Sequence, residues 1–443
     1  MVRSKETLEL QYTNLTPNSM DQWNRGRKFM PGGIIKGAYW QSPHPIYISS
    51  AKDCYVWDID DRKYTDFVNH HTALILGHTP PNVINALAQS ISNGIVYGAP
   101  VQSEAEISEE ICRRIPSIEK IRFTNSGPEA SLHATRLIRA ATGKSKIAKF
   151  EGAYHGSHDA LEISVSTRID KSGSPQKPNS VPAWEGFAPD SSDNIIILPY
   201  HDETAVENIL REHKNDLAGV FYEGIGGTQP VDIPPAFTRF VRKITSDLGL
   251  IMVMDEVVSF RMGYGGYQSV CGINPDLTIL GKIIGGGLPV GALGGRADLM
   301  NILDNTQGRP RVSQSGTFSG HPMTLSAGLA TLNDLTVDVY DYLNILGTRL
   351  REGLCSMFDE LCTPCEVIQQ GSIVAIYFTD KPVVDTRSKM DTDNELNELV
   401  TLSLLTKGYL VPQGLGLTLT SSMNDSHIDN LVAAIGETMI END

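Results

Sequence analysis

The 443-residue chain contains few cysteines, and their spacing fits neither a metal site nor a disulfide framework. Of the six, Cys362 and Cys365 form a Cys-x-x-Cys pair, and no second pair stands at a matching distance. A zinc ribbon needs two such pairs, and a disulfide-built secreted domain is shorter and denser in cysteine. Both classes are therefore excluded, and we interpret the pair as buried or idle thiols.

The chain also lacks an excess of basic residues and any long apolar run. Its 37 Lys and Arg stand against 52 Asp and Glu, which gives a net charge of −15 and a pI near 5.2. Nucleic acids and acidic membrane surfaces select clustered basic residues, so neither is an expected partner. No run approaches about 18 consecutive apolar residues, and the first residues contain no apolar leader segment. We predict a cytoplasmic enzyme with reduced thiols that acts on small molecules.

What the chain does contain is an alternation of short apolar segments with helical ones, beginning near residue 121. Strands that are apolar on both faces and alternate with helices predict an α/β fold, with a mostly parallel central sheet covered by helices. Such a sheet binds ligands at the carboxyl ends of its strands. The expected strands are 121–124, 147–150, 195–198, 219–223, 250–254 and 277–280.

Three regions are expected along the chain. Residues 1–80 form an N-terminal appendage, a helix up to Phe29 followed by small antiparallel strands, which packs with the C-terminal domain. Residues 81–336 form the large domain, and residues 337–443 form a smaller α+β domain. A long stretch between residues 150 and 194 predicts a flap over the site, because loops of that length inside compact domains are usually functional.

Two of the apolar runs deliver groups of opposite charge to one edge of the predicted sheet. One ends on Asp255, and the other ends just before Lys282. Either residue alone equally predicts a solvated strand-end lysine or a helix-capping aspartate. Together they match pyridoxal 5'-phosphate, which requires an amine to form a Schiff base and a carboxylate to keep its pyridine nitrogen protonated.

Two further loops follow predicted strands. Ser126 and Gly127 lie between a strand and a helix, where free N–H groups and a hydroxyl suit a phosphate, although an ordinary helix cap has the same pattern. Tyr154 follows the next strand and is placed either to stack on a flat heteroaromatic ring or to pack in the core.

The motifs in order are Asn125-Ser126-Gly127, Tyr154-His155-Gly156, Asp255-Glu256-Val257, Lys282 with Gly285-Gly286-Gly287, and Ser315-Gly316-Thr317-Phe318. This series resembles the class III aminotransferases, fold-type I pyridoxal-phosphate enzymes that include glutamate-1-semialdehyde aminomutase, over nearly the whole chain. The resemblance implies that Lys282 holds the Schiff base and Asp255 the pyridine nitrogen. It also implies that Tyr154 and Val257 cover the two ring faces.

By the same resemblance, Ser126 and Gly127 bind the cofactor phosphate, and Glu223 lies near the cofactor. Thr317 would reach the phosphate of the neighbouring subunit, which implies a homodimer with shared active sites. Pro128 stands where the family commonly has threonine, so one N–H and one hydroxyl are missing from the phosphate cradle and weaker retention is expected.

The family's usual Glu-Pro appears here as Glu223-Gly224, which predicts a looser backbone at that strand end.

The substrate side departs further from the family. After Pro31-Gly32-Gly33 the chain lacks the Ser-Pro-Val-Arg-like segment of glutamate-1-semialdehyde aminomutases. It is more similar to β-amino-acid and D-phenylglycine aminotransferases. In the β-amino-acid enzymes two arginines bind carboxylates, and Lys36 and Gln413 fall at those two positions. A point charge and a neutral amide hold carboxylates less well than a planar guanidinium. With Tyr39, Trp40 and His71 as walls, the expected pocket suits a partly apolar or aromatic amine, and ordinary packing in the N-terminal appendage is the alternative for each of the three.

These residues support three functions. The first is a pyridoxal-phosphate-dependent aminotransferase, which moves an amino group from an amino acid or amine to a keto acid or ketone through a Lys282 aldimine. The donors could include β-amino acids and aromatic or apolar amines. The second is an isomerase on the same cofactor, either a glutamate-1-semialdehyde-type aminomutase or an amino-acid racemase. The third is a binding protein without turnover. Lys282 and Asp255 weigh against the third, and the missing arginine weighs against the aminomutase.

Overall fold

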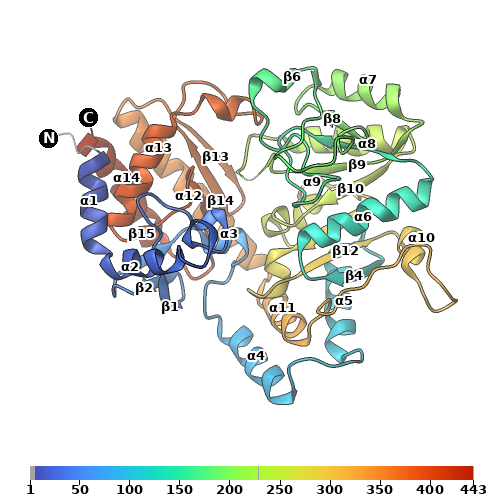
Figure 1. Ribbon diagram of the computed structural model, residues 1–443, viewed down its shortest axis with the longest axis horizontal. Coiled ribbons are helices and arrows are strands. Elements are labelled where there is room, and N and C mark those ends of the chain that lie inside the picture. Colours follow the sequence, from blue (N-terminus) through green and yellow to red (C-terminus); the bar gives the residue numbers. More distant parts are fainter. Residues whose placement is uncertain (1–4, 228, 443) are drawn as a thin grey trace. The chain divides into compact units, whose positions relative to one another are not determined.

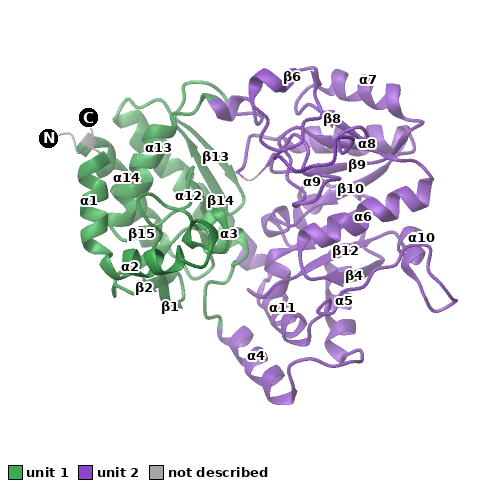
Figure 2. Ribbon diagram, in the orientation of Figure 1, with its two compact units in different colours: residues 1–80, 341–382, 391–443 green, residues 81–340, 383–390 purple. Residues whose placement is uncertain are grey.

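The computed structural model describes residues 5–227 and 229–442 (Figure 1), and the chain divides into two compact units (Figure 2). Unit 1 comprises Met1–Pro80, Asp341–Pro382 and Asp391–Asp443, and unit 2 comprises Pro81–Tyr340 and Val383–Met390. The short segment Val383–Met390 thus belongs to unit 2, although the chain on either side of it belongs to unit 1.

Unit 2 is built on a seven-stranded sheet with the order β4-β12-β11-β10-β9-β5-β8. Its strands are β4 (Lys120–Thr124), β5 (Lys146–Phe150), β8 (Ile195–Leu198), β9 (Leu217–Glu223), β10 (Ile251–Asp255), β11 (Leu277–Gly281) and β12 (Gly291–Gly295). From β8 through β11 each neighbouring pair is parallel, whereas β12 runs antiparallel to both β11 and β4. The predicted α/β fold class is confirmed, and each of the six expected strands is present.

The seventh strand, β12, was not predicted, because Gly291-Ala292-Leu293-Gly294-Gly295 contains no β-branched or aromatic residue. Close packing explains its glycines. A Cβ at Gly291 would overlap the carbonyl of Ser126, and one at Gly294 would lie 2.6 Å from Cγ2 of Ile118. The strand therefore needs glycine where neighbouring segments approach its backbone.

Helices cover the sheet: α6 packs on β9, β11 and β12, and α8 packs on β10 (Figure 1). Ser126 caps α6 by accepting the N–H of Glu129, and Gly143 ends the helix at a φ of 72°. The α-helices of unit 2 are α4 (Pro81–Asn93), α5 (Gln102–Arg114), α6 (Gly127–Thr142), α7 (Glu203–His213), α8 (Pro235–Asp247), α9 (Gly266–Cys271), α10 (Ala297–Met300) and α11 (Pro322–Asp334).

The core of unit 2 lies between α6 and the sheet. It includes Leu137 and Ile138 of α6 together with Ile147, Phe221 and Val253 of three strands, all fully buried. Each such side chain stabilises the fold by about 1.5–3 kcal/mol. The strand ends that carry the predicted site are thus held by a rigid platform.

The stretch between β5 and β8, expected to be a flap, contains its own structure. It includes η3 (Ile169–Lys171), the two short strands β6 (Gly173–Ser174) and β7 (Lys177–Pro178), and a bridge between Ile163 and Pro182. Ile163 is fully buried in the core, so the beginning of this stretch is anchored to the sheet.

Unit 1 holds a four-stranded sheet, β1-β2-β3-β15, and a three-stranded sheet, β13-β14-β16. β15 pairs in parallel with β3, so residues far apart in the chain share one sheet. The strands are β1 (Ile48–Lys52), β2 (Tyr55–Asp58), β3 (Lys63–Asp66), β13 (Glu366–Gln370), β14 (Ile373–Tyr377), β15 (Tyr409–Leu410) and β16 (Gly416–Thr418).

The single N-terminal helix expected up to Phe29 is two helices, and that expectation was wrong. Thr16 has a φ of −132°, and Pro17 opens the second helix. The helices here are α1 (Lys5–Leu15), α2 (Pro17–Gly26), α3 (Asn69–Thr72), α13 (Asn394–Thr406) and α14 (Asp425–Asn442), and α12 (Val337–Glu360) leads from unit 2 into unit 1.

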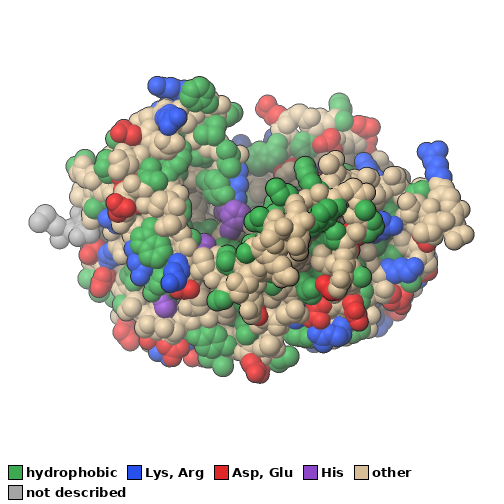
Figure 3. Space-filling view, turned by 90° about the horizontal axis from the view of Figure 1, so that it is seen from below, with side chains coloured by type: hydrophobic (Ala, Val, Ile, Leu, Met, Phe, Trp, Pro, Cys, Tyr) green, Lys and Arg blue, Asp and Glu red, His purple; other side chains and the backbone are tan. Residues whose placement is uncertain are grey.

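Of the described helices, none is long and apolar enough to cross a lipid bilayer. On the face that Figure 3 displays, acidic and basic side chains are interspersed rather than gathered into a patch of one sign. A basic patch, which a nucleic-acid partner would select, is not seen on that face.

Candidate active site

The predicted cofactor residues lie at the carboxyl edge of the sheet in unit 2. Ser126 follows β4, Tyr154 follows β5, Glu223 ends β9, Asp255 ends β10 and Lys282 follows β11. β10 lies between β9 and β11, and its register places Asp255 directly beside Glu223. The sheet therefore brings an amine, two carboxylates and a loop at a helix N-terminus to one edge.

Asp255 is buried and held from two sides. Its Oδ1 accepts the N–H of Val257 at 3.0 Å, and its Oδ2 lies 2.8 Å from Nδ1 of His155. Burial lowers the pKa of His155, so the imidazole is neutral, and since a carboxylate only accepts, Nδ1 carries the hydrogen. Nε2 of His155 is buried and has no hydrogen-bond partner among the described residues.

A second buried charge system lies beside this pair. Burial, together with the neighbouring Asp255, raises the pKa of Glu223 to about 8, and its Oε1 accepts the N–H of Tyr154 at 3.3 Å. Burial lowers the pKa of Lys149 to about 7, and Glu223 acts in the opposite direction. Nζ of Lys149 donates to the carbonyls of Ala153 at 2.7 Å and Ile163 at 2.6 Å, which ties down the loop before Tyr154.

The N-terminus of α6 is closely packed by the segments that surround it. A Cβ at Gly127 would lie 2.9 Å from Cγ2 of Val257, and one at Gly156 would lie 2.6 Å from Cα of Pro128. Pro128, which departs from the family pattern, therefore packs directly on the Gly156 backbone. The cradle fits an anion held by backbone N–H groups at a helix N-terminus.

Lys282 has an unusual backbone. Its φ of 50° lies in the left-handed region, which costs a non-glycine residue about 1 kcal/mol or more and is concentrated at functional sites. A Cβ at the preceding Gly281 would lie 3.3 Å from Cγ1 of Val257. Because Val257 also borders Gly127, one side chain connects the loop before α6 with the segment that carries Lys282.

Thr317 lies in an exposed loop of unit 2. A Cβ at the adjacent Gly316 would lie 3.3 Å from Nδ2 of Asn125, so the loop passes the residue before Ser126 in the same chain. The role of Thr317 towards a second subunit stays a prediction.

The four predicted substrate residues all belong to unit 1. Nζ of Lys36 lies 4.2 Å from the ring centroid of Tyr39, and the Tyr39 and His71 rings are stacked with centroids 6.3 Å apart. Nε2 of Gln413 donates to the carbonyl of Trp40 at 2.8 Å. Contacts thus join Lys36 with His71 and Gln413 with Trp40 within this unit.

His71 lies in a run of four left-handed residues, from Asn69 to Thr72, with φ between 46° and 73°. None of the four is glycine, so the run is strained. Nδ2 of Asn69 donates to the carbonyls of Thr418 at 2.7 Å and Asp66 at 3.0 Å, which holds the turn in place. This strain orients His71 and cannot be read from residue type.

Sequence reasoning missed Lys149 and assigned no role to His155. A signal for Lys149 existed, because it lies between the apolar residues Ala148 and Phe150 near the end of a strand, and a buried lysine requires polar partners.

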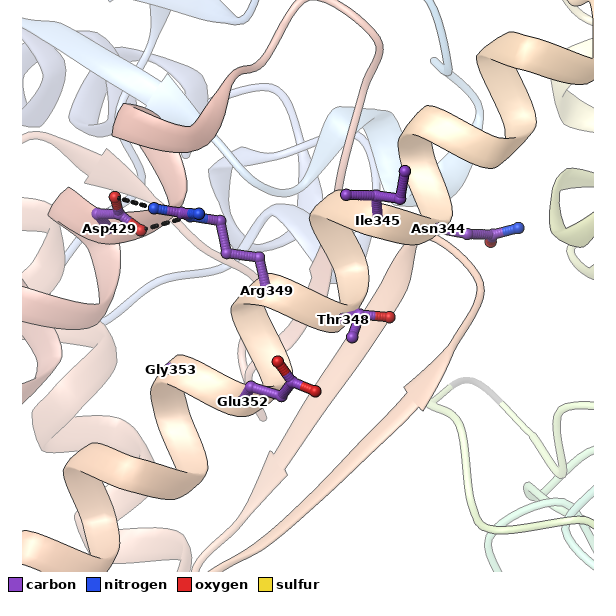
Figure 4. A pocket seen from close by; sticks show the side chains of 7 residues that line it. All are labelled: Asn344, Ile345, Thr348, Arg349, Glu352, Gly353 and Asp429. Atoms are coloured by element: carbon purple, nitrogen blue, oxygen red, sulfur yellow. Dashed lines mark hydrogen bonds and ion pairs between the residues drawn. The ribbon is translucent and has the colours of Figure 1, made fainter.

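A surface cavity of about 590 Å³ in unit 1 is a weaker candidate (Figure 4). Arg349, on α12, points towards Asp429 and forms two hydrogen bonds with it, at 2.7 and 2.6 Å. The cationic group of this cavity is thus already paired. In the part of the chain that the structure describes, no group of three or more His, Cys, Asp or Glu side chains is arranged to hold a metal ion.

Known proteins resemble this chain in both sequence and structure. The family model described as "Aminotransferase class-III" matches residues 37–435. Two curated relatives are glutamate-1-semialdehyde 2,1-aminomutase 2 of Halalkalibacterium halodurans, 36% identical over 93% of this chain and 95% of that protein, and glutamate-1-semialdehyde 2,1-aminomutase of Desulfotalea psychrophila, 37% identical over the same shares.

Among solved structures, an omega-transaminase from Sphaerobacter thermophilus superposes with a TM-score of 0.92 at 34% identity, covering 96% of this chain and 97% of that one. A β-phenylalanine aminotransferase from Variovorax paradoxus superposes with a TM-score of 0.89 at 30% identity, covering 98% and 96%.

Proposed function

This chain belongs to the class III aminotransferase family, and from that membership we propose that it is a transaminase, which moves an amino group between an amine or amino acid and a keto acid or ketone. The enzyme depends on pyridoxal phosphate. When bound, this cofactor supplies an electron sink that makes the hydrogen on the amine-bearing carbon acidic. The remaining chemistry falls to the residues of unit 2.

The residues at the sheet edge fit this cofactor. Asp255, supported by His155 and the N–H of Val257, would hold the pyridine nitrogen in its protonated form. Ser126 and the glycine-lined N-terminus of α6 would hold the phosphate. The missing N–H of Pro128 leaves one donor fewer at that end.

Lys282 is the residue that we assign to hold the cofactor covalently. When its Nζ is not engaged in that bond, it would act as the base that takes up and returns the proton of the substrate. Val257 and Tyr154 would cover the two ring faces, and Glu223 would lie beside Asp255 as a carboxyl group with a raised pKa.

The observation that carries the substrate preference is the type and the surroundings of two residues, Lys36 and Gln413. Lys36 lies over the Tyr39 ring, and Gln413 donates a hydrogen bond to the carbonyl of Trp40. Neither offers a guanidinium to a carboxylate, and the neighbouring rings favour apolar or aromatic groups. We therefore propose that small apolar or aromatic amines and amino acids, β-amino acids included, are preferred as donors over dicarboxylates.

The second candidate is an isomerase, and the curated relatives favour it, because those compared are glutamate-1-semialdehyde aminomutases. The two candidates differ in the fate of the amino group. An aminomutase returns it to the same substrate, a racemase never takes it off its carbon, and a transaminase leaves it on the cofactor for a different acceptor.

Mixing the enzyme with single amines, without an acceptor, separates a transaminase from a racemase. A transaminase converts the cofactor stoichiometrically to its pyridoxamine form, which absorbance records, and recovers when a keto acid is added. A racemase instead exchanges the α-hydrogen of one substrate while the absorbance stays nearly constant. If no amine in the panel converts the cofactor, the transaminase proposal is wrong.

We also propose a homodimer. Large apolar side chains are exposed along α4 and the loop after it, and Phe318 beside Thr317 is exposed as well. The exposed residues of the first group are Ile84, Ile91, Ile95, Val96 and Tyr97. An apolar surface of this kind marks an interface, and a second copy of the chain would cover it and bring Thr317 to a neighbouring phosphate. Sedimentation of an active monomer would rule this out.

A further inference from the structure

The segment Val383–Met390 forms a compact turn of its own within unit 2, although it lies between two stretches of unit 1 in sequence. Asp385 Oδ1 accepts hydrogen bonds from the N–H and hydroxyl of Ser388, both at 2.8 Å. The Ser388 hydroxyl accepts the N–H groups of Val384 and Asp385, both at 3.0 Å. The turn holds its own shape and presents Arg387 and Lys389.

Arg387 pairs with Glu151, which directly follows β5. Its Nε donates to Oε2 at 2.8 Å and its Nη2 to Oε1 at 3.0 Å, and the two side chains are only 14% and 6% exposed. Burial raises the pKa of Glu151, and Arg387 acts in the opposite direction. A bidentate pair with little exposure is among the stronger side-chain contacts.

The same guanidinium also reaches the flap. Nη1 donates to the carbonyl of Gly173 at 2.9 Å, and Nη2 donates to that of Ser172 at 3.0 Å. One side chain therefore joins the residue after β5 to the short strand β6, more than twenty residues further along the chain.

Lys389 fixes a second loop. Its Nζ donates to the carbonyls of Gln229 at 2.6 Å and Gly226 at 3.2 Å, and these residues follow Glu223 at the end of β9. The carbonyl of Val383 accepts the N–H of Asp232 at 3.2 Å. This loop carries the Gly224 that replaces the family's proline, so a contact from outside compensates for the looser backbone.

The residue after Glu151 is a glycine that allows the turn 383–390 to pack closely against the backbone. Gly152 has a φ of 79°, and a Cβ there would lie 2.5 Å from Cβ of Thr386. Glycine is needed on both counts, the left-handed conformation and the close approach. Gly152 stands two residues before Tyr154.

From these contacts we infer that Arg387 and Lys389 are positioning residues, which hold the loop bearing Tyr154 and the loop after Glu223 in the geometry that retains the cofactor. The inference rests on the proposed roles of Tyr154 and Glu223. Neither basic side chain needs to contact the cofactor, because each acts through a loop.

The test compares Arg387→Met with the double variant Arg387→Met/Glu151→Gln, and uses Arg168→Met as the matched control. Arg168 belongs to the same flap, but its side chain is 78% exposed and pairs with Asp170 alone. The single variant leaves a buried carboxylate unpaired, which by itself destabilises a protein. The double variant removes both charges and therefore keeps the test valid if the single variant folds poorly.

Two quantities are measured: hydrogen exchange of the cofactor-free protein over residues 151–156 and 172–174, and the rate of pyridoxal phosphate release from the holoenzyme. We expect both to rise about tenfold or more in the single variant and less in the double variant, because only the former strands a buried charge. The control should match the wild type. Lys389→Met should accelerate exchange at 224–227 and leave 172–174 unchanged.

Exchange and release within about twofold of the wild type in both Arg387 variants would overturn the inference, since a lost buried charge pair has larger effects. Faster exchange with unchanged release would overturn the positioning role towards the cofactor. Hydrogen exchange is measured without cofactor, so its result does not depend on the proposed function. Failure of the proposed function is recognised separately, as intact turnover in a Lys282→Ala variant.

Discussion

The residues that we assign to the cofactor and those that we assign to the substrate are held in different ways. In unit 2, Asp255, Glu223 and Lys149 are buried, and each is bonded to a backbone or ring group. In unit 1, Trp40 and Gln413 are exposed, and Lys36 is held by a ring contact.

This difference indicates which residues can be substituted without a large loss of stability. A buried charge cannot lose its partner without a large penalty, so the chemistry of the sheet edge is hard to vary. Exposed aromatic and cationic groups are weakly coupled to stability, so substrate preference can shift by single substitutions. The predictions below test this contrast.

The largest effect is expected for Lys282→Ala. No other amine is assigned to the end of β11, so the variant should lose covalent cofactor attachment and turnover altogether. Absorbance of the purified protein and borohydride reduction followed by mass spectrometry measure attachment, with Lys243→Ala on the exposed face of α8 as control. Turnover of the Lys282 variant at the wild-type rate would exclude the assignment.

Asp255→Asn should come next. The amide keeps the size of the side chain but cannot hold the pyridinium charge, so cofactor should bind while kcat falls by about 10²-fold or more. The exposed Asp247→Asn is the control, because its partner Lys243 is also at the surface. A near-native kcat for Asp255→Asn would remove Asp255 from its role.

Some of these features were accessible from the sequence. Asp255 and Lys282 end or follow short, largely apolar runs, so their strands and their shared edge were predicted correctly. Strand β12 was not predicted, because its glycines are required by the close approach of neighbouring segments and have no β propensity of their own. The same applies to Asn69–Thr72, whose left-handed turn depends on hydrogen bonds to Asp66 and Thr418.

The contact between Arg387 and Glu151 spans 236 positions in the chain. No periodicity or local motif predicts such a contact, so from the sequence Arg387 would be interpreted as a solvated surface residue. What the sequence predicts well is local order; what it misses here are contacts made by tertiary packing.

A third prediction compares charge pairs of the two units. Asp276, which directly precedes β11, accepts hydrogen bonds from Arg242 at 2.7 Å and Arg296 at 2.9 Å. Burial raises the pKa of Asp276, but the N–H of Met252 and the two guanidinium groups lower it more, so it lies below 3.8. Asp276→Asn should therefore lower the free energy of unfolding by about 3 kcal/mol at neutral pH.

The sign of the pH dependence follows from that shift. A folded-state pKa below the unfolded value means that the carboxylate stabilises the fold above the unfolded value and loses this contribution as the pH falls through the folded value. Urea unfolding should show a constant gap between wild type and variant until the pH drops below 3.8, where the gap shrinks. Asp429→Asn, at the exposed pair of unit 1, should change little throughout.

The smallest and most specific effect concerns Gln413→Arg. An arginine at this exposed position would add the guanidinium that favours dicarboxylates in the relatives that this chain resembles, and it would forgo the hydrogen bond to the Trp40 carbonyl. We expect the ratio of kcat/KM for glutamate to that for an apolar amine to rise about tenfold, with little change in stability, since one charge-assisted hydrogen bond supplies about that factor. Gln11→Arg, on the exposed face of α1 in the same unit, adds the same charge elsewhere and should leave the ratio unchanged.

If glutamate is already the best donor of the wild type, the role given to Gln413 is wrong, and Lys36 becomes the first candidate for the second carboxylate. In that case the Lys36 ammonium must leave the Tyr39 ring, and Lys36→Met should abolish the preference for glutamate while the rate with apolar amines stays near that of the wild type.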